Sequence, residues 1–588
     1  MPISRTEGRT MKRFFLILLL CAVCLLAACG GDDIPSDSTR PDSSVAEDST
    51  LPGSGSEDDP LSTDAPVGTT DEGDSTAAED TTHGEGETLA PPEEDGRETI
   101  EDTLPAPSVT EEETQLQKQP PYVVTVVCSL HEGVTLTGGD TVQTLTAAAD
   151  FAPLSVTVGA DFCYNGYEIG GVVYRDSVIR LPEGELTDDV TVTVLVSYLT
   201  EDLPVVSVHT NGVSVDSKEY VDMTLSLTNT EDIMLDVPGS IRLRGNSTYG
   251  FPKKPYRIKL EQKHSFFGLD KAKSWVLLAD WLDPSTLHNY AALTLAGTSE
   301  NFDFVPTPYK VNLYLNGTYQ GVYTLCEQVQ EQAGRLDLEM EIKRSMGKLE
   351  DYNFLICMNH NAPQKPNAEE GVTYFYLSCV DRYFELEYPT REDFPTEAQF
   401  HRFFTSLEDY MRETAMAFLA SDRAYITQNV DVDSLIDLFL VDQIMGERDH
   451  HWKSVFMSYR GAEGDAKLSF GPPWDYDFCM FTQWTGEPNE EFELSNDFNP
   501  AEAAFFYRPL LENAYFTRKV ASRYKNHFSD AITETIAAVE AQAAAMGESL
   551  ELNQDRWYDH LPGITEDNVD FFIRYLKNRK AVLDRKWG

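Results

Sequence analysis

Carboxylates near the C-terminal third of the sequence have types and spacing suited to metal and phosphate chemistry. Asp475 and Asp477 are two residues apart, so their side chains would lie on one face of an extended chain. Trp474, Tyr476 and Phe478 alternate with them, and an acid among such large side chains is costly unless it is paired or bound to a metal. Hard oxygen ligands favour Mg²⁺ or Mn²⁺. A solvated turn is the ordinary interpretation of an isolated Asp-x-Asp, and the flanking aromatic residues argue against it here.

A third carboxylate, Asp449, lies 26 residues before Asp475. Between the two acids, residues 455–459 and 467–470 alternate in the manner of two β-strands. A hairpin built from these strands would bring Asp449 and Asp475 together at its open end. The sequence therefore predicts one acidic site assembled from two segments.

Residues 242–260 concentrate Lys and Arg in a chain that is otherwise acidic. A strand leads into a turn of small residues, and a second strand follows. On the second strand Arg257 and Lys259 point to the face opposite Tyr256 and Ile258. A turn of small residues exposes backbone N–H groups, and neighbouring cations can neutralise phosphates. An ordinary basic hairpin is the alternative.

The stretch from about residue 203 to 585 resembles the CotH kinase family, which is named for a bacterial spore-coat protein. The resemblance rests on the order and spacing of several motifs, each of which would be weak alone. In chain order these are Arg244-Gly-Asn-Ser-Thr with Lys253-Lys-Pro-Tyr-Arg-Ile-Lys-Leu; Trp275-Val-Leu-Leu-Ala-Asp with Asp283; Val311-Asn-Leu-Tyr-Leu-Asn-Gly-Thr-Tyr-Gln-Gly-Val-Tyr-Thr-Leu-Cys-Glu327; Asp449 with Trp452-Lys-Ser; and Gly471-Pro-Pro-Trp-Asp-Tyr-Asp.

The resemblance implies an atypical, two-lobed protein-kinase-like domain that transfers the γ-phosphoryl of ATP, with Mg²⁺ or Mn²⁺, to Ser or Thr of surface or spore-coat-type proteins. Asp449 sits where the family's catalytic aspartate accepts the proton of the attacking hydroxyl. Asp475 sits where the metal is bound, with Asp477 close by. Such roles fit phosphoryl transfer, in which positioning and charge neutralisation supply most of the catalysis. The implied cofactor-binding residues, for the phosphates and the nucleotide, are Arg244, Lys254, Lys259 and Glu327.

Two positions depart from the family pattern. The family usually has Arg-Asn where this chain has His288 and Asn289, and many members have Asn where this chain has Glu447. A carboxylate two residues before Asp449 would change metal affinity or raise a pKa. Neither departure removes a principal acid.

Two other functions remain open from the sequence. The first is a non-catalytic surface-binding or adhesion lipoprotein, in which a pseudokinase fold presents a recognition face. The second is another metal-dependent transferase or hydrolase that uses the Asp-x-Asp site. Labelling of a protein by ATP distinguishes the kinase from both.

The elements that position these residues predict an α+β protein. Residues 120–200 alternate with period two and are broken by Gly-rich turns, which predicts a small, all-β, sandwich-like domain of antiparallel strands. Strand-like segments continue from 203 to about 330, and helical patterns dominate from about 395 to the end of a domain that we place at 203–588. Residues 433–446 are predicted to form a mostly buried helix, and the Ala-rich residues 530–548 another.

Residues 30–119 consist mainly of Ser, Thr, Asp, Glu, Gly and Pro, with 26 acids and three Lys or Arg in residues 31–119. Such a chain cannot bury enough apolar surface to offset its conformational entropy, so it is predicted to be a disordered acidic tether. The whole chain has a net charge of −52. This charge argues against nucleic acid as a partner, because phosphate backbones require a basic face.

The N-terminus has the pattern of an export signal. Lys12 and Arg13 precede fifteen apolar residues, 14–28, a length that suits a signal peptide better than a membrane span. Leu26-Ala-Ala-Cys29 then resembles the lipobox of bacterial lipoproteins. We therefore expect a signal peptide over 1–29 and a lipid on Cys29 that anchors the protein to the outer face of a bacterial cell membrane.

Overall fold

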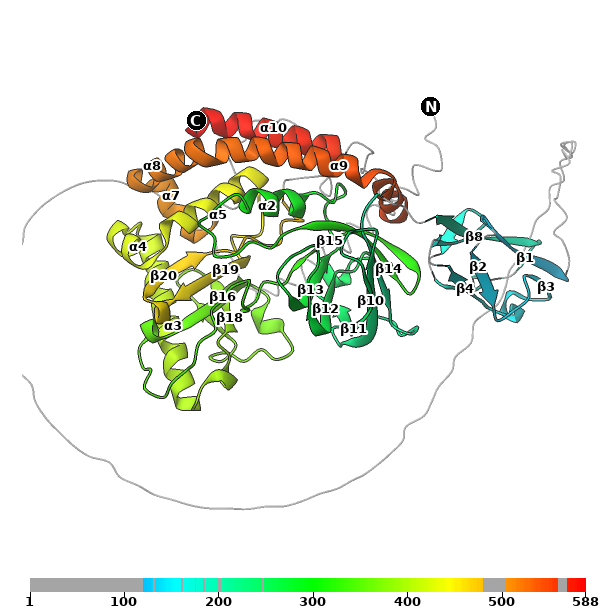
Figure 1. Ribbon diagram of the computed structural model, residues 1–588, viewed down its shortest axis with the longest axis horizontal. Helices are drawn as coiled ribbons and strands as arrows, with labels where there is room; N and C mark the ends of the chain where they lie inside the picture. Colours follow the sequence, from blue (N-terminus) through cyan, green and yellow to red (C-terminus); the bar gives the residue numbers. More distant parts are fainter. Residues whose placement is uncertain are drawn as a thin grey trace, which may run out of the picture. The chain divides into compact units, whose positions relative to one another are not determined.

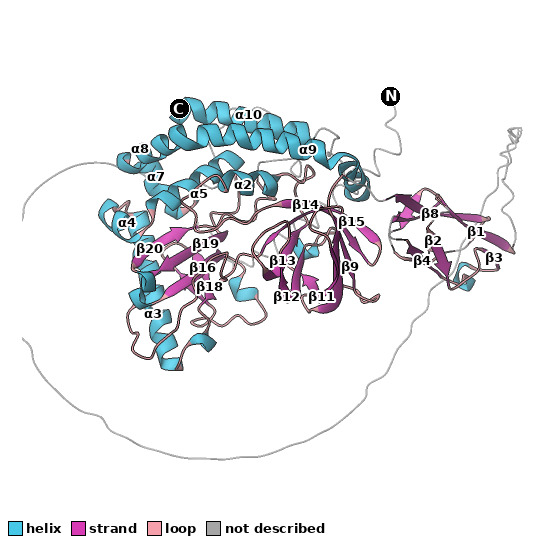
Figure 2. Ribbon diagram, viewed as in Figure 1, coloured by secondary structure: helices cyan, strands magenta, loops and turns pink. Residues whose placement is uncertain are grey.

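The computed structural model describes residues 120–130, 133–159, 162–174, 176–182, 184, 186–198, 202–245, 248–479, 503–558 and 568–588. The predicted signal peptide, the predicted lipidation site Cys29, the predicted tether, and Asn246 and Ser247 of the basic motif lie outside these residues. The described chain is a mixed α+β protein, rich in strands in its N-terminal part and in helices toward its C-terminus (Figure 2). None of the helices in these ranges is long and apolar enough to cross a membrane.

The first β-rich region contains two sheets around a common core. Val124, Leu154, Val192 and Val194 are fully buried in that core. The prediction of antiparallel strands is wrong for β1 and β8, which pair in parallel. Alternation in sequence specifies which face of a strand is buried and says nothing about the direction of its neighbour. One sheet has the order β5-β8-β1-β3, with β6 beside β5, and is built from β1 (Tyr122–Cys128), β3 (Val142–Leu145), β5 (Phe162–Ile169), β6 (Val172–Tyr174) and β8 (Val190–Tyr198); the other has the order β2-β4-β7 and is built from β2 (Val134–Thr137), β4 (Leu154–Val158) and β7 (Val178–Ile179).

The sheet that contains β5 continues through a parallel pair with β15, in which Tyr164 lies opposite Thr318, and its remaining strands close on themselves. The order of these strands is β13-β12-β11-β10-β9-β14-β15, and β13 also pairs with β15, so that Trp275 lies opposite Glu327. Ile258, Trp275 and Tyr323 are fully buried in the core of this closed part. Its strands are β9 (Val205–His209), β10 (Val221–Thr228), β11 (Met234–Leu243), β12 (Tyr256–His264), β13 (Ala272–Leu278), β14 (Tyr309–Leu315) and β15 (Thr318–Glu327).

A separate sheet, of order β17-β18-β16-β19-β20, is surrounded by helices and is called the helix-covered sheet below (Figure 1). The predicted hairpin is confirmed as β19 and β20, in which Met457 lies opposite Phe470. The strands are β16 (Asn353–Asn359), β17 (Tyr374–Leu377), β18 (Arg382–Tyr388), β19 (Lys453–Arg460) and β20 (Asp465–Phe470). The helices are α2 (His288–Ala296), α3 (Glu397–Leu419), α4 (Arg423–Asn429), α5 (Val432–Met445), α7 (Arg508–Glu512), α8 (Ala514–Arg523), α9 (Ser529–Trp557) and α10 (Asn568–Trp587).

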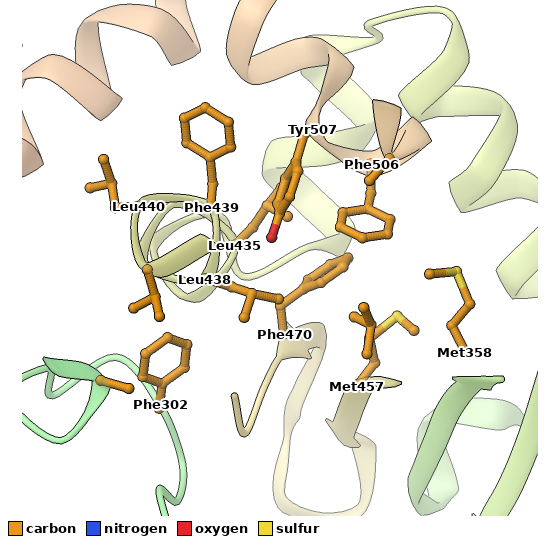
Figure 3. Close-up of a cluster of buried hydrophobic side chains, with 14 of the residues drawn as sticks. Phe302, Met358, Leu435, Leu438, Phe439, Leu440, Met457, Phe470, Phe506 and Tyr507 are labelled. Carbon is orange, nitrogen blue, oxygen red and sulfur yellow. The ribbon is translucent and has the colours of Figure 1, made fainter. Parts of the chain in front are cut away.

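Helix α5 forms the centre of the largest core and confirms the predicted buried helix. The Asp431 carboxylate accepts the N–H of Asp433 and caps the helix start, and Gly446, with φ of 65°, ends it in the left-handed conformation. Every residue of the helix except Asp433 is buried, including the carboxylates of Asp437 and Asp442. In Figure 3 its side chains Leu435, Leu438, Phe439 and Leu440 lie among Phe302, Met457, Phe470 and Tyr507. The loop after Gly446, which carries Asp449, therefore begins at the end of a buried helix.

The closed sheet, β9–β15, and the helix-covered sheet share an apolar junction. Leu278 and Cys326 of the closed sheet belong to one buried cluster with Leu355, Phe456 and Trp474. Helix α9 runs beside α10 and also contacts β15 (Figure 1). The loops that carry the acidic motifs leave from this junction.

Candidate active site

The loop after α5 holds Asp449 through Glu447. The Oε2 atom of Glu447 accepts the N–H of Asp449 at 2.5 Å and the N–H of His450 at 3.2 Å. The carboxylate of Asp449 accepts the indole N–H of Trp452 at 3.3 Å and pairs with the ammonium of Lys453 at 2.7 Å. The position of Asp449 is thus fixed on both its backbone and its side chain.

Glu447 itself is fully buried, and its Oε1 atom has no hydrogen-bond partner among the described residues. Burial raises the pKa of Glu447 to about 8; the charge of His450 opposes this shift, and the carboxylates of Asp449 and Asp442 add to it. The carboxyl group is therefore mostly protonated at neutral pH. The sequence predicted that a carboxylate two residues before Asp449 would change metal affinity or raise a pKa. In the structure the pKa of Glu447 itself is raised.

His450 connects the loop of Asp449 to the loop of the Asp-x-Asp motif. Its Nδ1 donates to the Asp442 carboxylate at 3.0 Å, and its Nε2 donates to the carbonyl of Trp474 at 2.8 Å. Burial alone would lower the pKa of His450, but the negative charge of Asp442, together with that of Glu447 when it is ionised, outweighs burial and raises the pKa to about 10. Both ring nitrogens consequently carry protons, as the two hydrogen bonds require.

The backbone around Asp475 adopts a conformation that only a few residue types tolerate. Asp475 has φ of 73° and Ser454 has φ of 62°, both in the left-handed region, and the Ser454 hydroxyl donates to Asp475 Oδ2 at 2.8 Å. Asp475 is therefore not extended, so the condition under which its side chain would share a face with that of Asp477 is not met by the backbone at this residue. Asn289 holds the next residue, because its Oδ1 accepts the N–H of Tyr476 at 2.9 Å while its Nδ2 donates to Asp280 at 2.8 Å. Strained backbone of this kind concentrates at functional sites.

The carboxylates at this point interact with one another and with Lys453. Burial raises the pKa of Asp477 well above its usual value, and the charges of Asp475, Asp280 and Asp449 raise it further. Lys453 opposes that shift, and its own pKa is raised by Asp449 and then by Asp475, although burial alone would lower it. The structure therefore brings together Asp449, Asp475 and Asp477, the three acids that the sequence predicted to share one site.

Neighbouring carboxylate oxygens are the kind of ligand that a divalent cation such as Mg²⁺ takes. No group of three or more His, Cys, Asp or Glu within the described ranges is arranged to hold a metal by itself. Mg²⁺ is commonly bound through one or two carboxylates, with water and substrate phosphates as the remaining ligands. Asp475 and Asp477 are the two carboxylates that would supply such ligands, so the residues present fit a metal that the substrate helps to coordinate.

Arg244 is the predicted phosphate-binding residue that the structure brings to the acids. Its guanidinium lies 5.3 Å from the centre of the Trp474 ring. Burial lowers the pKa of Arg244, and the charges of Asp475 and Asp477 counteract this while Arg257 adds to it. Arg257 was not predicted as a site residue, although the same strand face that singled out Lys259 contains it.

The other predicted phosphate-binding residues lie elsewhere. The ammonium of Lys254 donates to the carbonyl of Tyr249 at 2.8 Å, and Lys259 is exposed on β12. Lys253, which precedes them, is fully buried and donates to Asn553 Oδ1 at 2.9 Å. Burial lowers the pKa of Lys253 to about 7. Lys253 therefore connects the segment before β12 to helix α9.

Glu327 lies at the end of β15, where it is buried. Its Oε2 accepts the N–H of Thr307 at 2.8 Å. Burial raises the pKa of Glu327, and the charge of Arg335 counteracts this shift. The described contacts place Glu327 beside Thr307 and Arg335 and do not connect it to Asp475.

Sequence reasoning did not single out Lys453, whose ammonium pairs with Asp449. It lies four residues after Asp449, a spacing at which side chains can meet, and its motif was noted for the resemblance only. Asn289 is similar, because its role depends on contacts with Asp280 and Tyr476 that are distant in sequence.

The fold and the site define an α+β protein with an acidic centre between a closed sheet and a helix-covered sheet. The family model for CotH kinase protein matches residues 241–583, which is more than half of the chain. The chain therefore belongs to the CotH kinase family, whose membership implies kinase activity and the use of ATP. A comparison with curated proteins finds no match.

Proposed function

We propose that this protein is an atypical, two-lobed protein kinase that transfers the γ-phosphoryl group of ATP to Ser or Thr of surface or spore-coat-type proteins. The closed sheet and the helix-covered sheet would be its two lobes. The observation that carries the proposal is the convergence of Asp449, Lys453, Asp475 and Asp477, with Arg244 beside them. This set supplies a proton acceptor, cations for phosphate charge and ligands for a divalent metal.

Each residue has a role that follows from its position. Asp449 accepts the proton of the attacking hydroxyl, whose oxygen forms a bond to the γ-phosphorus as the bond to the β–γ bridging oxygen breaks and ADP leaves. Lys453 and Arg244 neutralise charge that develops on the phosphoryl oxygens. A Mg²⁺ or Mn²⁺ ion held by Asp475 and Asp477 would polarise the phosphates when bound.

The proposed location is the outer face of a bacterial cell membrane. The lipobox-like sequence at Cys29 supports a lipid anchor, and the acidic composition of residues 30–119 supports a tether that carries the domain away from the bilayer. The partners would be a surface or coat protein and the membrane itself, through the lipid.

Incubation of the purified full chain with labelled ATP and Mg²⁺ or Mn²⁺ tests the proposal. We expect the label to be transferred to protein, and Asp449→Asn and Asp475→Asn to abolish the transfer. Asp222→Asn is the matched control, because Asp222 is an exposed acid on β10, and it should label normally. If the folded wild type binds no nucleotide and labels no protein, the kinase proposal is overturned in favour of a non-catalytic surface-binding protein. Phosphate release without protein labelling would favour another metal-dependent transferase or hydrolase.

A further inference from the structure

The face of the β17–β18 hairpin that points away from the core carries three tyrosines, together with Glu385, which lies opposite Tyr374 and pairs with Lys365. Tyr376 lies directly opposite Tyr383, with ring centres 4.8 Å apart, and Tyr374 lies diagonally at 5.9 Å from Tyr383. The alternate residues of the same strands, including Phe375 and Phe384, are buried in the core. The side chains that fill the core therefore come from the opposite face of the hairpin. Packing in the core does not account for the three tyrosines on the outward face.

The three tyrosines belong to a row of aromatic rings that continues to Asp449. The ring of His360 lies 6.4 Å from that of Tyr383 and stacks on Trp452 at 5.2 Å, with 28° between the ring planes. Trp452 in turn donates its indole N–H to Asp449. The row therefore ends at the residue that would accept the proton of the acceptor hydroxyl.

The backbone holds this end of the row in place. The guanidinium of Arg382, in β18, donates to the carbonyl of His451 at 2.7 Å, and the His451 ring stacks on Trp452 at 5.1 Å. The position of the aromatic row relative to Asp449 is thus determined by a link between the hairpin and the loop.

We infer that the row Trp452, His360, Tyr383, Tyr376 and Tyr374 is the docking surface for an extended segment of the acceptor protein that carries apolar, prolyl or aromatic side chains next to its Ser or Thr. This inference rests on the proposed kinase function. Rigid aromatic rings offer large contact area at low cost in side-chain entropy, and such residues dominate binding energy at interfaces. The ring-to-ring steps from Trp452 to Tyr376 are 5.2, 6.4 and 4.8 Å, which corresponds to at most about five residues of an extended chain at about 3.3 Å per residue.

A degenerate Ser/Thr peptide library with labelled ATP tests the inference on the full chain. The wild type should select apolar, prolyl or aromatic residues within about five positions on one side of the acceptor. Tyr383→Ala and Tyr376→Ala should lose that selection and raise the KM for a selected peptide roughly fivefold or more, with nucleotide affinity unchanged. Leu235→Ala is the control, because Leu235 is 65% exposed on β11 and should behave as the wild type.

The outcomes separate this inference from the proposed function. A wild type that binds no ATP overturns the kinase proposal itself. A wild type that labels the library without such a preference, or tyrosine variants that keep it, overturns the docking surface alone. Loss of polysaccharide binding in the variants, with peptide labelling unchanged, would show that the row binds sugar and also overturns the inference.

Discussion

Replacing Glu447 with Gln separates the two properties of this buried carboxyl group. The side-chain oxygen of Gln can still accept the N–H groups of Asp449 and His450, as Glu447 Oε2 does. The amide cannot ionise, so the variant corresponds to the protonated form of Glu447. Labelling by the variant at pH 7 should therefore be close to that of the wild type. Glu447→Ala, in contrast, leaves two N–H groups without their acceptor, at a cost of about 1–3 kcal/mol each, and should lose labelling.

The pH dependence of stability gives the magnitude. The pKa of Glu447 is about 8 in the folded protein and 4.5 in the unfolded chain, so the folded state binds more protons between these values. The free energy of unfolding contributed by Glu447 is fully present below pH 4.5 and is lost as the pH rises toward 8. The expected slope is about 1.4 kcal/mol per pH unit. The Gln variant lacks this loss and should become more stable relative to the wild type as the pH rises.

Chemical denaturation of both proteins between pH 5 and 6 measures this difference. His450 is predominantly protonated in the folded and unfolded states over that range, since its pKa is 6.5 unfolded and about 10 folded, so it contributes little to the slope. The other carboxylates are common to both proteins and cancel in the comparison. Equal slopes for the two proteins would refute the reasoning and would mean that Glu447 is ionised in the native state.

Three further predictions concern Lys453 in the site, the buried Lys253, and Arg257 beside Arg244. Lys453→Met should reduce labelling by roughly 10²-fold or more without unfolding the protein, because Asp449 and the phosphates lose their cation; circular dichroism confirms the fold and labelled ATP the loss. Lys253→Met should flatten the rise in unfolding free energy between pH 7 and 10.5, because the pKa of Lys253 falls from 10.5 to about 7 on folding and the unfolded chain binds the extra proton; urea melts across that range measure the slope. Arg257→Ala should weaken nucleotide binding roughly tenfold and Lys259→Ala should not, since only Arg257 is close to Arg244; equal effects in a fluorescent-nucleotide titration would contradict this assignment.

Parts of the site were predictable because they depend on local sequence. The period of the apolar residues after Asp431 located α5, and Gly446 marked its end, so the start of the Asp449 loop was predictable. The alternation on either side of residues 461–464 located the β19–β20 hairpin, and with it the approach of Asp449 to the Asp-x-Asp motif. Family resemblance then gave roles to these acids, and the family match over 241–583 supports it.

Other parts were not predictable because they depend on which face of an element meets another element. From the sequence, Lys254, Lys259 and Arg244 were equal candidates for phosphate binding. In the structure Arg244 lies over Trp474, whereas Lys254 donates to the carbonyl of Tyr249. The parallel pairing of β1 and β8 was missed for a similar reason, since strand direction is decided by the path of the chain between the strands.

The amino-acid sequence by itself determined the order of the elements, the family and the identity of the three principal acids, because periodicity and motif spacing are local properties. Only the tertiary structure decided the ionisation of Glu447, the left-handed backbone of Asp475 and the row of rings that ends at Trp452. Each of these depends on burial or on contacts between residues far apart in the chain, and desolvation and packing are established only when distant segments meet.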